Sequence, residues 1–410
     1  MDIRADNRRA ADHEPDPTGG VVEATNRRLS DLDESRAFEE HWTCSRALNA
    51  SLTLSHDDGT TEDFTDLCSS YGAVNFGHCN EDIRLPAQPG VDLVAGIYPP
   101  EAEKFARWLT NALDVNDFKV LFQVGGSFAV STAQRSMALH ETPLRQSLAS
   151  FVEVLTPGEM DIDWSAISCL IFEPIQGARG YVPLDADWLH ELCAQAKAAR
   201  VTVIADEIQC GFYRFGDFSV ARNMGLNPDV LLFSKSMTNG LYPFSAVVYR
   251  QTLEAAIGDG VVLAHTFQTS AIGCYAACAV ADYIDAHDVE ADCRRVAEPL
   301  ADAAARIAEN NWARDIYQIG PSLSFRPVMN AGDLVKECFS DRVLILGGGM
   351  EVERIRIAPP LPIASEDLRD ALEVMFSRLG TASYPIMAAD VVGYPRLMEQ
   401  DTEGVGSPRS

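Results

Sequence analysis

The sequence has no long uninterrupted apolar segment. None of its apolar runs approaches the roughly 20 residues that a membrane-spanning helix requires. The first residues, MDIRADNRRAADHEPDPTGG, are polar and contain no apolar signal core. The composition, with 47% hydrophobic and 23% charged residues, is typical of a globular protein with a large core. We therefore expect a cytoplasmic protein that neither enters a membrane nor is secreted.

Positive charge is also scarce. The chain has 33 lysine and arginine residues against 60 aspartate and glutamate residues, and its formal net charge is -27. An electrostatic field of this sign repels phosphate backbones. The composition therefore argues against a nucleic-acid partner.

Closely paired cysteines are missing as well. The ten cysteines form no Cys-x-x-Cys pair, and Cys274 and Cys278 lie in an apolar stretch with helical spacing. Scattered cysteines of this kind are typical of reduced, buried, small apolar residues. Because no spacing of histidine and cysteine indicates a zinc site, we expect no metal.

Two polar segments poor in large apolar residues lie at the ends of the chain. We interpret residues 1–24 as a flexible arm and residues 396–410 as a flexible tail. Further in, alternating residues around Asp58-Gly59 predict a β-hairpin. Near the other end, Ser365 with two following acidic residues predicts a helix start, and Gly380 predicts its stop.

The middle of the chain, residues 96–285, alternates between strand and helix patterns. Helical spacing predicts one helix from Pro99 and another around Leu189. Valine-, isoleucine- and leucine-rich strands with helices between them indicate an α/β domain with a mainly parallel sheet covered on both faces. Residues 25–95 and 286–395 would then form a smaller domain. The apolar runs that predict buried strands are 118–124, 168–174, 201–206, 229–234 and 245–249.

Three polar residues follow these strands at their carboxyl ends, where open α/β sheets bind ligands: Glu173, Asp206 and Lys235. A buried aspartate or lysine alone is most often part of a salt bridge or a helix cap. Asp206 and Lys235 together, each ending a strand, match what pyridoxal phosphate (PLP) requires. That cofactor needs a lysine for a Schiff base and a carboxylate that keeps its ring nitrogen protonated. Burial favours the neutral lysine that can attack.

Several blocks of the sequence resemble the class III aminotransferases, of the ornithine and diaminobutyrate type, of PLP fold type I. The resemblance extends from about residue 40 to residue 380. It implies an α/β large domain with a mainly parallel seven-stranded sheet between helices, and a smaller α+β domain built from both chain ends. The matching blocks are VNFGHCN (74–80), EPIQG (173–177), IADEIQCGFYRFG (204–216), DVLLFSKSMTNGLYPFSAVV (229–248) and RIAPPL (356–361).

The resemblance implies PLP as the cofactor and a role for each matching residue. Lys235 would form the Schiff base and later move protons, and Asp206 would pair with the ring nitrogen. Gln209 would hydrogen-bond the ring 3-hydroxyl group. Gly126 and Ser127 match the phosphate loop, where backbone amides at a helix start can hold a phosphate.

Further residues would reach the phosphate and the substrate. Thr266 matches a threonine that contacts the phosphate from the neighbouring subunit, so the resemblance implies a homodimer. Arg356 matches the arginine that binds a substrate carboxylate, a task suited to its planar fork. Tyr71 and Arg179 are expected to shape the substrate pocket.

The sequence departs from the family pattern in three places. The phosphate loop reads Ser127–Ser131 where the family has Thr-Glu-Ala-Asn-Glu. Ala178 replaces a glutamate that in many members pairs with the carboxylate-binding arginine. The region before residue 150 lacks the aromatic-His-Gly turn whose ring stacks on the cofactor. Either this loop is absent or a stretch around 144–150 is missing. His140, the nearest candidate, is more typical of a solvated helix end, so we assign no stacking residue.

Three functions remain open at this point. The first is an aminotransferase acting on an amino acid or an ω-amine. The second keeps PLP but catalyses elimination, γ-replacement with carbon–carbon bond formation, or decarboxylation, as an enzyme of specialised metabolism. The loss of the glutamate at Ala178 and the altered phosphate loop favour this second function. The third is a cofactor-free scaffold. Five retained residues argue against the scaffold: Lys235, Asp206, Gln209, Thr266 and Arg356.

Overall fold

The structure is a computed structural model that describes most of residues 42–382. The expected arm (1–24), the expected tail (396–410), His140 and the segment 144–150 lie outside the described residues. The described residues are 42–56, 58–86, 90–92, 97–134, 151–153, 162–257, 265–349 and 351–382.

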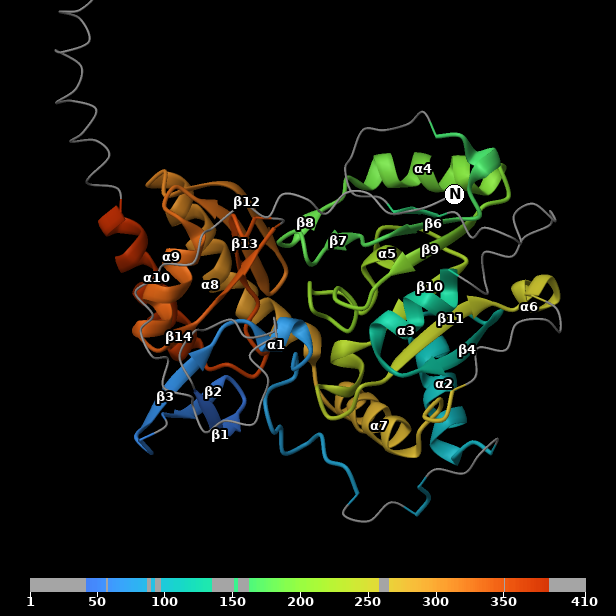
Figure 1. Ribbon diagram of the computed structural model, residues 1–410, viewed down its shortest axis with the longest axis horizontal. Helices are drawn as coiled ribbons and strands as arrows, with labels where there is room; N and C mark the ends of the chain where they lie inside the picture. Colours follow the sequence, from blue (N-terminus) through green and yellow to red (C-terminus); the bar gives the residue numbers. More distant parts are fainter. Residues whose placement is uncertain are drawn as a thin grey trace, which may run out of the picture. The chain divides into compact units, whose positions relative to one another are not determined.

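A mainly parallel sheet of six strands lies at the centre of the described chain (Figure 1). One strand, β11, runs antiparallel to both of its neighbours, and the remaining neighbouring pairs are parallel. All five runs predicted as strands form strands, within two residues at each end, whereas the resemblance implied a seven-stranded sheet. In spatial order the strands are β4 (Phe118–Gln123), β11 (Ser245–Arg250), β10 (Val230–Phe233), β9 (Thr202–Asp206), β6 (Cys169–Phe172) and β5 (Phe151–Glu153).

Helices cover both faces of this sheet, as the sequence predicts. On one face, Ala129 of α3 (Gly125–Thr132) packs with Ile204 and Leu232 in a buried cluster. On the other face, Phe105 of α2 (Pro100–Ala112) contacts Phe122, with 6.1 Å between the ring centroids. Two more helices complete this layer structure: α4 (Ala186–Ala198), which contacts β6 and β9, and α7 (Ala271–Ala286), which packs against α2.

A second sheet joins the two halves of the chain. The predicted hairpin is confirmed, because β2 (Ser51–Ser55) and β3 (Thr61–Asp66) pair antiparallel, and β1 (Thr43–Leu48) extends them. β14 (Val343–Leu344) then pairs parallel to β3. In Figure 1 these N-terminal strands, in blue, accordingly lie beside C-terminal elements in orange and red. The domain boundaries 25–95, 96–285 and 286–395 remain predictions.

A third sheet belongs to the C-terminal region and carries one candidate site residue, Arg356. Its strands, in spatial order, are β12 (Ala313–Ile319), β13 (Ser322–Pro327), β16 (Arg354–Ile357) and β15 (Leu346–Gly348). Three helices flank it: α8 (Val289–Glu309), α9 (Ala331–Ser340) and α10 (Ser365–Ala382). The sequence predicts a last helix from Ser365 to Gly380, and α10 has this start and extends two residues further, to Ala382.

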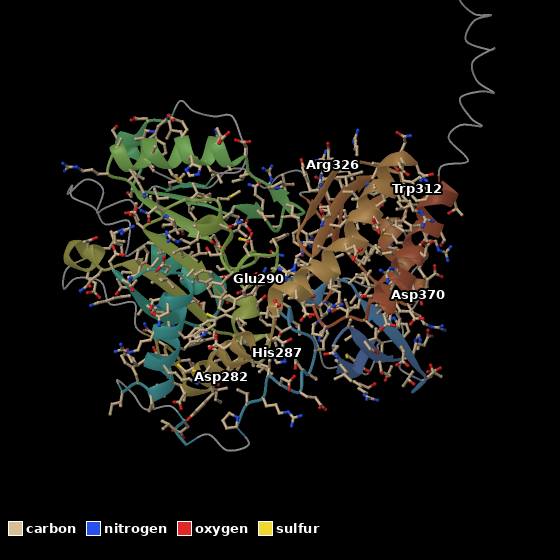
Figure 2. All side chains as sticks on the ribbon, turned by 180° about the vertical axis from the view of Figure 1, so that it is seen from behind. Asp282, His287, Glu290, Trp312, Arg326 and Asp370 are labelled. Carbon is tan, nitrogen blue, oxygen red and sulfur yellow. The ribbon has the colours of Figure 1, made fainter. Side chains whose placement is uncertain are left out.

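The helices α7 and α8 follow each other directly. His287 lies between α7, which carries Asp282, and α8, which carries Glu290 (Figure 2). The remaining elements are α1 (Ser69–Gly72), β7 (Ile175–Gln176), β8 (Val182–Pro183), α5 (Val220–Asn223), α6 (Thr252–Ile257) and the 3₁₀ helices η2 (Trp164–Ala166) and η3 (Lys235–Thr238).

All ten cysteines are free. Eight are buried, as the sequence predicts, but Cys44 and Cys79 are exposed. Within the described ranges, no helix is long and apolar enough to cross a membrane. In the same ranges, no group of three or more histidine, cysteine, aspartate and glutamate side chains is arranged to hold a metal ion.

Candidate active site

The site lies at the carboxyl edge of the central sheet. Leu232 of β10 pairs with Asp206 of β9, and β6 lies in parallel on the other side of β9. Because parallel strands end at the same edge, their next polar residues come together there. These residues are Asp206, Glu173 after β6 and Lys235 after β10, so the sequence-based placement of all three is confirmed.

Lys235 has an unusual backbone and a precise side-chain contact. Its φ of 44° lies in the left-handed region, which is unfavourable for a residue with a side chain. Its Nζ donates a hydrogen bond of 2.9 Å to Oε1 of Gln209. Burial lowers the pKa of the Lys235 amine, and the charge of Arg356 lowers it further, whereas the carboxylates of Glu173 and Asp206 oppose this shift. The balance favours an amine that loses its proton more easily than a lysine in water.

Asp206 is shifted in the opposite direction. Burial raises the pKa of its carboxyl group to about 7, and the nearby charge of Glu173 adds to this effect. The backbone N–H of Ile208, which donates to Oδ1 at 3.0 Å, and the charge of Lys235 act against it. A carboxylate in such surroundings is stabilised by any further positive group that binds beside it.

The Gln209 side chain presents a buried donor, Nε2, to the site. Its Nε2 is buried and makes no hydrogen bond of normal geometry to the described residues. Tyr181 lies beside it, and burial raises the pKa of the Tyr181 phenol while the Gln209 side chain lowers it. Space around Gln209 is tight, since a Cβ at Gly177 would lie 2.1 Å from Oε1. Buried donors are nearly always paired in native proteins, so Nε2 is suited to an oxygen atom of a ligand.

Arg356 is nearly buried and holds no carboxylate in the described structure. Its Nε and Nη2 donate to the carbonyl oxygen of Gly347 at 3.0 and 2.6 Å, and Nη1 donates to the carbonyl of Gly177 at 3.1 Å. The rings of Tyr71 and Tyr181 each lie 5.6 Å from the guanidinium carbon. The guanidinium is therefore fixed in place by neutral groups, and its charge remains available to an anion.

The start of α3 forms another part of the same edge. β4 runs parallel to β10, since β11 is antiparallel to both, so α3 begins at the carboxyl end of its strand. Its N-cap residue, Val124, provides no side-chain cap, so among the described residues the first amides of this helix are open to an anion. Ser127 is exposed in this turn. A Cβ at Gly126 would lie 3.0 Å from Ile208, so the glycine lets this turn approach the segment that follows Asp206.

Two candidate residues lie less centrally than the others. Thr266 is exposed in a turn that follows His265, whose Nε2 lies 2.5 Å from Oε1 of Gln123 in the same chain. Arg179 is partly buried in the turn after Gly177. Tyr71, by contrast, is 41% exposed and directly faces Arg356.

Reasoning from the sequence missed two contributors. Gly177 ends the EPIQG block that begins with the strand-end residue Glu173. A glycine in this place was the available signal that another side chain, here Gln209, packs closely against the backbone. Tyr181 carries no such signal, because its φ of 59° and its contact with Arg356 arise only in the folded chain.

The sequence that builds this site matches a known protein family. A family model described as Aminotransferase class-III matches residues 159–379, which is more than half of the 410 residues. The chain belongs to the class-III aminotransferase family. The matched range contains the strand-end residues Asp206 and Lys235 and the arginine of β16, Arg356.

The chain is similar to several named aminotransferases. An acetylornithine aminotransferase from Oceanobacillus iheyensis is 26% identical over 61% of this chain and 62% of its own length. A probable 4-aminobutyrate aminotransferase from Bacillus subtilis is 26% identical over 51% of this chain and 50% of its own length. The mitochondrial ornithine aminotransferase of Rattus norvegicus is 22% identical over 76% of this chain and 81% of its own length. In the first two of these matches, the chain covers only about half to three fifths of the relative's own length.

Solved structures with the same fold cover more of the chain. The acetylornithine aminotransferase from Elizabethkingia anophelis aligns with a TM-score of 0.71 and 21% identity, over 84% of this chain and 94% of that one. A PLP-bound amine transaminase from an uncultivated Pseudomonas species aligns with a TM-score of 0.72 and 20% identity, over 87% and 99%. At these identities the alignments establish PLP fold type I for this chain.

Proposed function

We propose that this member of the class-III family binds PLP through Lys235 and transfers the amino group of an amino acid or an ω-amine. The observation that carries the proposal is the contact of the Lys235 Nζ with Gln209, next to Asp206, at the carboxyl edge of the sheet. PLP, when bound, supplies an aldehyde for covalent attachment and a protonated ring that accepts electrons.

The residues at this edge fit that cofactor. The partly buried carboxylate of Asp206 would hold the ring nitrogen in its protonated form, because a positive group beside it counteracts the rise in pKa that burial causes. The unpaired Nε2 of Gln209 would donate to the ring 3-hydroxyl oxygen. The lowered pKa of Lys235 supports two tasks, which are attack on the aldehyde and later transfer of a proton through Nζ.

The start of α3 would hold the phosphate. Gly126 and Ser127 bring free backbone amides to the sheet edge. We further propose a homodimer in which Thr266 of each subunit contacts the phosphate bound by the other. The exposure of Thr266 supports this arrangement, as do Phe128 and Phe267, which are 54% and 55% exposed and would be covered by a second copy.

Arg356 would bind the substrate carboxylate. Its guanidinium is held by carbonyl oxygens and by the ring of Tyr71, and this leaves its positive charge uncompensated at close range. Tyr71 and Arg179 would line the same pocket. The named relatives, which are acetylornithine, ornithine and 4-aminobutyrate aminotransferases, support an amino acid or an ω-amine as the amino donor.

A substrate panel tests the reaction. Purified protein loaded with PLP is incubated with single amino acids and ω-amines, and mass spectrometry follows both the cofactor and the product. We expect conversion of PLP to pyridoxamine phosphate and formation of the matching oxo product, followed by reversal with a 2-oxo acid. A product formed by elimination, replacement or decarboxylation, with PLP unchanged, would contradict amino transfer and favour the second hypothesis from the sequence.

A further inference from the structure

Arg214 is fully buried, although its hydrogen-bond partners carry no charge. Its side chain donates to Oγ of Ser69 at 3.2 Å and to the carbonyl oxygens of Ala358, Pro321 and Pro359 at 3.3, 3.1 and 3.1 Å. Burial lowers the pKa of its guanidinium. A buried cation without a hydrogen-bonded carboxylate is costly, so its retention calls for a structural or functional reason.

One of these partners belongs to a strained turn. Ser69, Ser70, Tyr71 and Gly72 have φ values of 50°, 49°, 58° and 77°, so four consecutive residues are left-handed. L-residues visit this conformation as single residues and avoid it in succession. A run of this kind persists only where surrounding contacts determine it.

Contacts from three other segments hold this left-handed turn. Oγ of Ser69 donates to the carbonyl of Ala358 at 2.7 Å, and Oγ of Ser236 donates to the carbonyl of Gly72 at 2.6 Å. Arg214 supplies the third contact. The turn is also shaped to this arginine, because a Cβ at Gly72 would lie 3.3 Å from its Cδ.

The two segments that Arg214 joins carry the two sides of the proposed carboxylate pocket. The left-handed turn presents Tyr71, and Ala358 follows Arg356 by two residues on the same chain segment. The Tyr71 ring and the Arg356 guanidinium face each other at 5.6 Å. Their separation therefore depends on how firmly the turn is held to the end of β16.

We propose that Arg214 is a positioning residue, which fastens the left-handed turn Ser69–Gly72 to the end of β16 and so sets Tyr71 against Arg356. The inference rests on the proposed function in one respect, which is that Arg356 binds a carboxylate. Among the described residues, the hydrogen bonds of Arg214 go to Ser69 and to backbone carbonyl oxygens that include Ala358, so it acts on Tyr71 and Arg356 through these residues.

Two variants and one matched control test this role. Arg214→Lys keeps the charge but loses the planar fork, and Ser69→Ala removes the hydroxyl group through which the turn bonds to both Arg214 and Ala358. The control is Ser322→Ala. Ser322 is equally buried and donates to the carbonyl oxygen of Arg214 at 3.1 Å, but it does not touch the left-handed turn.

The first measurement needs neither cofactor nor activity. Hydrogen exchange reports on the amides of Gly72, Ala73 and Val74, which bond within the turn. We expect these amides to exchange faster in Arg214→Lys and Ser69→Ala, and at the wild-type rate in Ser322→Ala. If these amides exchange at the wild-type rate in Ser69→Ala, the proposal is overturned. This result decides even if Arg214→Lys does not fold.

The second measurement tests the pocket. Calorimetry gives the dissociation constant of pentanoate, an unreactive carboxylate, with the PLP-loaded protein. We expect about tenfold weaker binding in both variants, with the cofactor absorbance unchanged and Ser322→Ala like wild type. Equal pentanoate binding in all proteins would make Arg214 a structural residue only. If the proposed function itself is wrong, the wild-type protein will transfer no amino group in the substrate panel. This outcome does not depend on how the variants bind pentanoate.

Discussion

The Nζ of Lys235 donates a hydrogen bond of 2.9 Å to Oε1 of Gln209, and this contact joins the ends of the neighbouring strands β10 and β9. The amine is thereby placed beside Asp206, which pairs in register with Leu232. An amine at a strand end with a left-handed backbone and a lowered pKa is poorly suited to a structural salt bridge. It is suited to covalent attachment of a cofactor aldehyde.

The first prediction concerns this amine. Lys235→Ala removes the only group we assign to covalent attachment, so the variant incubated with PLP should lack the near-visible absorbance band and retain no cofactor after borohydride reduction. Lys104→Ala is the control, because Lys104 is exposed and pairs with Asp282. If the Lys235→Ala variant still fixes PLP covalently, another lysine carries the cofactor.

The second prediction concerns the pH dependence of stability in the cofactor-free protein. Burial raises the pKa of Asp206 from 3.8 to about 7, so the folded state binds its proton more tightly than the unfolded state. The favourable contribution is fully present below about pH 4 and is lost as the pH rises to 7. Asp206→Asn cannot ionise and avoids this loss.

Asp206→Asn should therefore gain stability relative to wild type between pH 4 and pH 7, by on the order of a few kcal/mol. Urea unfolding at several pH values measures the difference. The comparison isolates Asp206 from Glu207, whose pKa burial also raises to about 7 and which is present in both proteins. A difference that stays constant across this range would mean that Asp206 has an ordinary pKa.

Much of the central sheet could be predicted from sequence because its signals are local. Each strand is a short run of valine, isoleucine or leucine, and the parallel arrangement places the residues after the strands at one edge. Asp206 and Lys235 were located in this way. Glu173 was placed by the same rule, but its effect on the pKa of Asp206 depends on β6 lying next to β9, which no local pattern specifies.

Other features depend on contacts between distant parts of the chain. Ser69 bonds to Ala358, and the left-handed backbone of Tyr71 exists because such contacts impose it. Nothing in the letters SSYG distinguishes this turn from an ordinary loop. Likewise, no local pattern around Arg214 indicates that its side chain is fully buried. The end of α10, at Ala382, lies two residues beyond Gly380, because a glycine marks the end of a helix only to within a residue or two.

The third prediction concerns space around Gln209. In Gly177→Ala the new Cβ would lie 2.1 Å from Oε1 of Gln209, so this side chain must move and its bond to Lys235 must break. We expect PLP to bind about tenfold more weakly in a titration of the cofactor-free protein, with a loss of about 1–3 kcal/mol in unfolding free energy from overpacking. Gly90→Ala is the control, since its Cβ would meet only the Tyr275 hydroxyl at 3.8 Å. Unchanged PLP affinity in Gly177→Ala would remove Gln209 from the cofactor site.

The fourth prediction concerns the carboxylate pocket. Arg356→Lys keeps a positive charge but lacks the planar fork that bonds Gly347 and Gly177, so the charge should lose its fixed position. For a substrate that carries a carboxylate, we expect KM to rise about 10- to 100-fold, while kcat changes much less. An amine substrate without a carboxylate should be unaffected, and Arg314→Lys, at an exposed position on β12, should behave as wild type. Equal increases in KM for both kinds of substrate would show that Arg356 shapes the pocket as a whole, and carboxylate binding would then fall to another group, for which Arg179 is the nearest candidate.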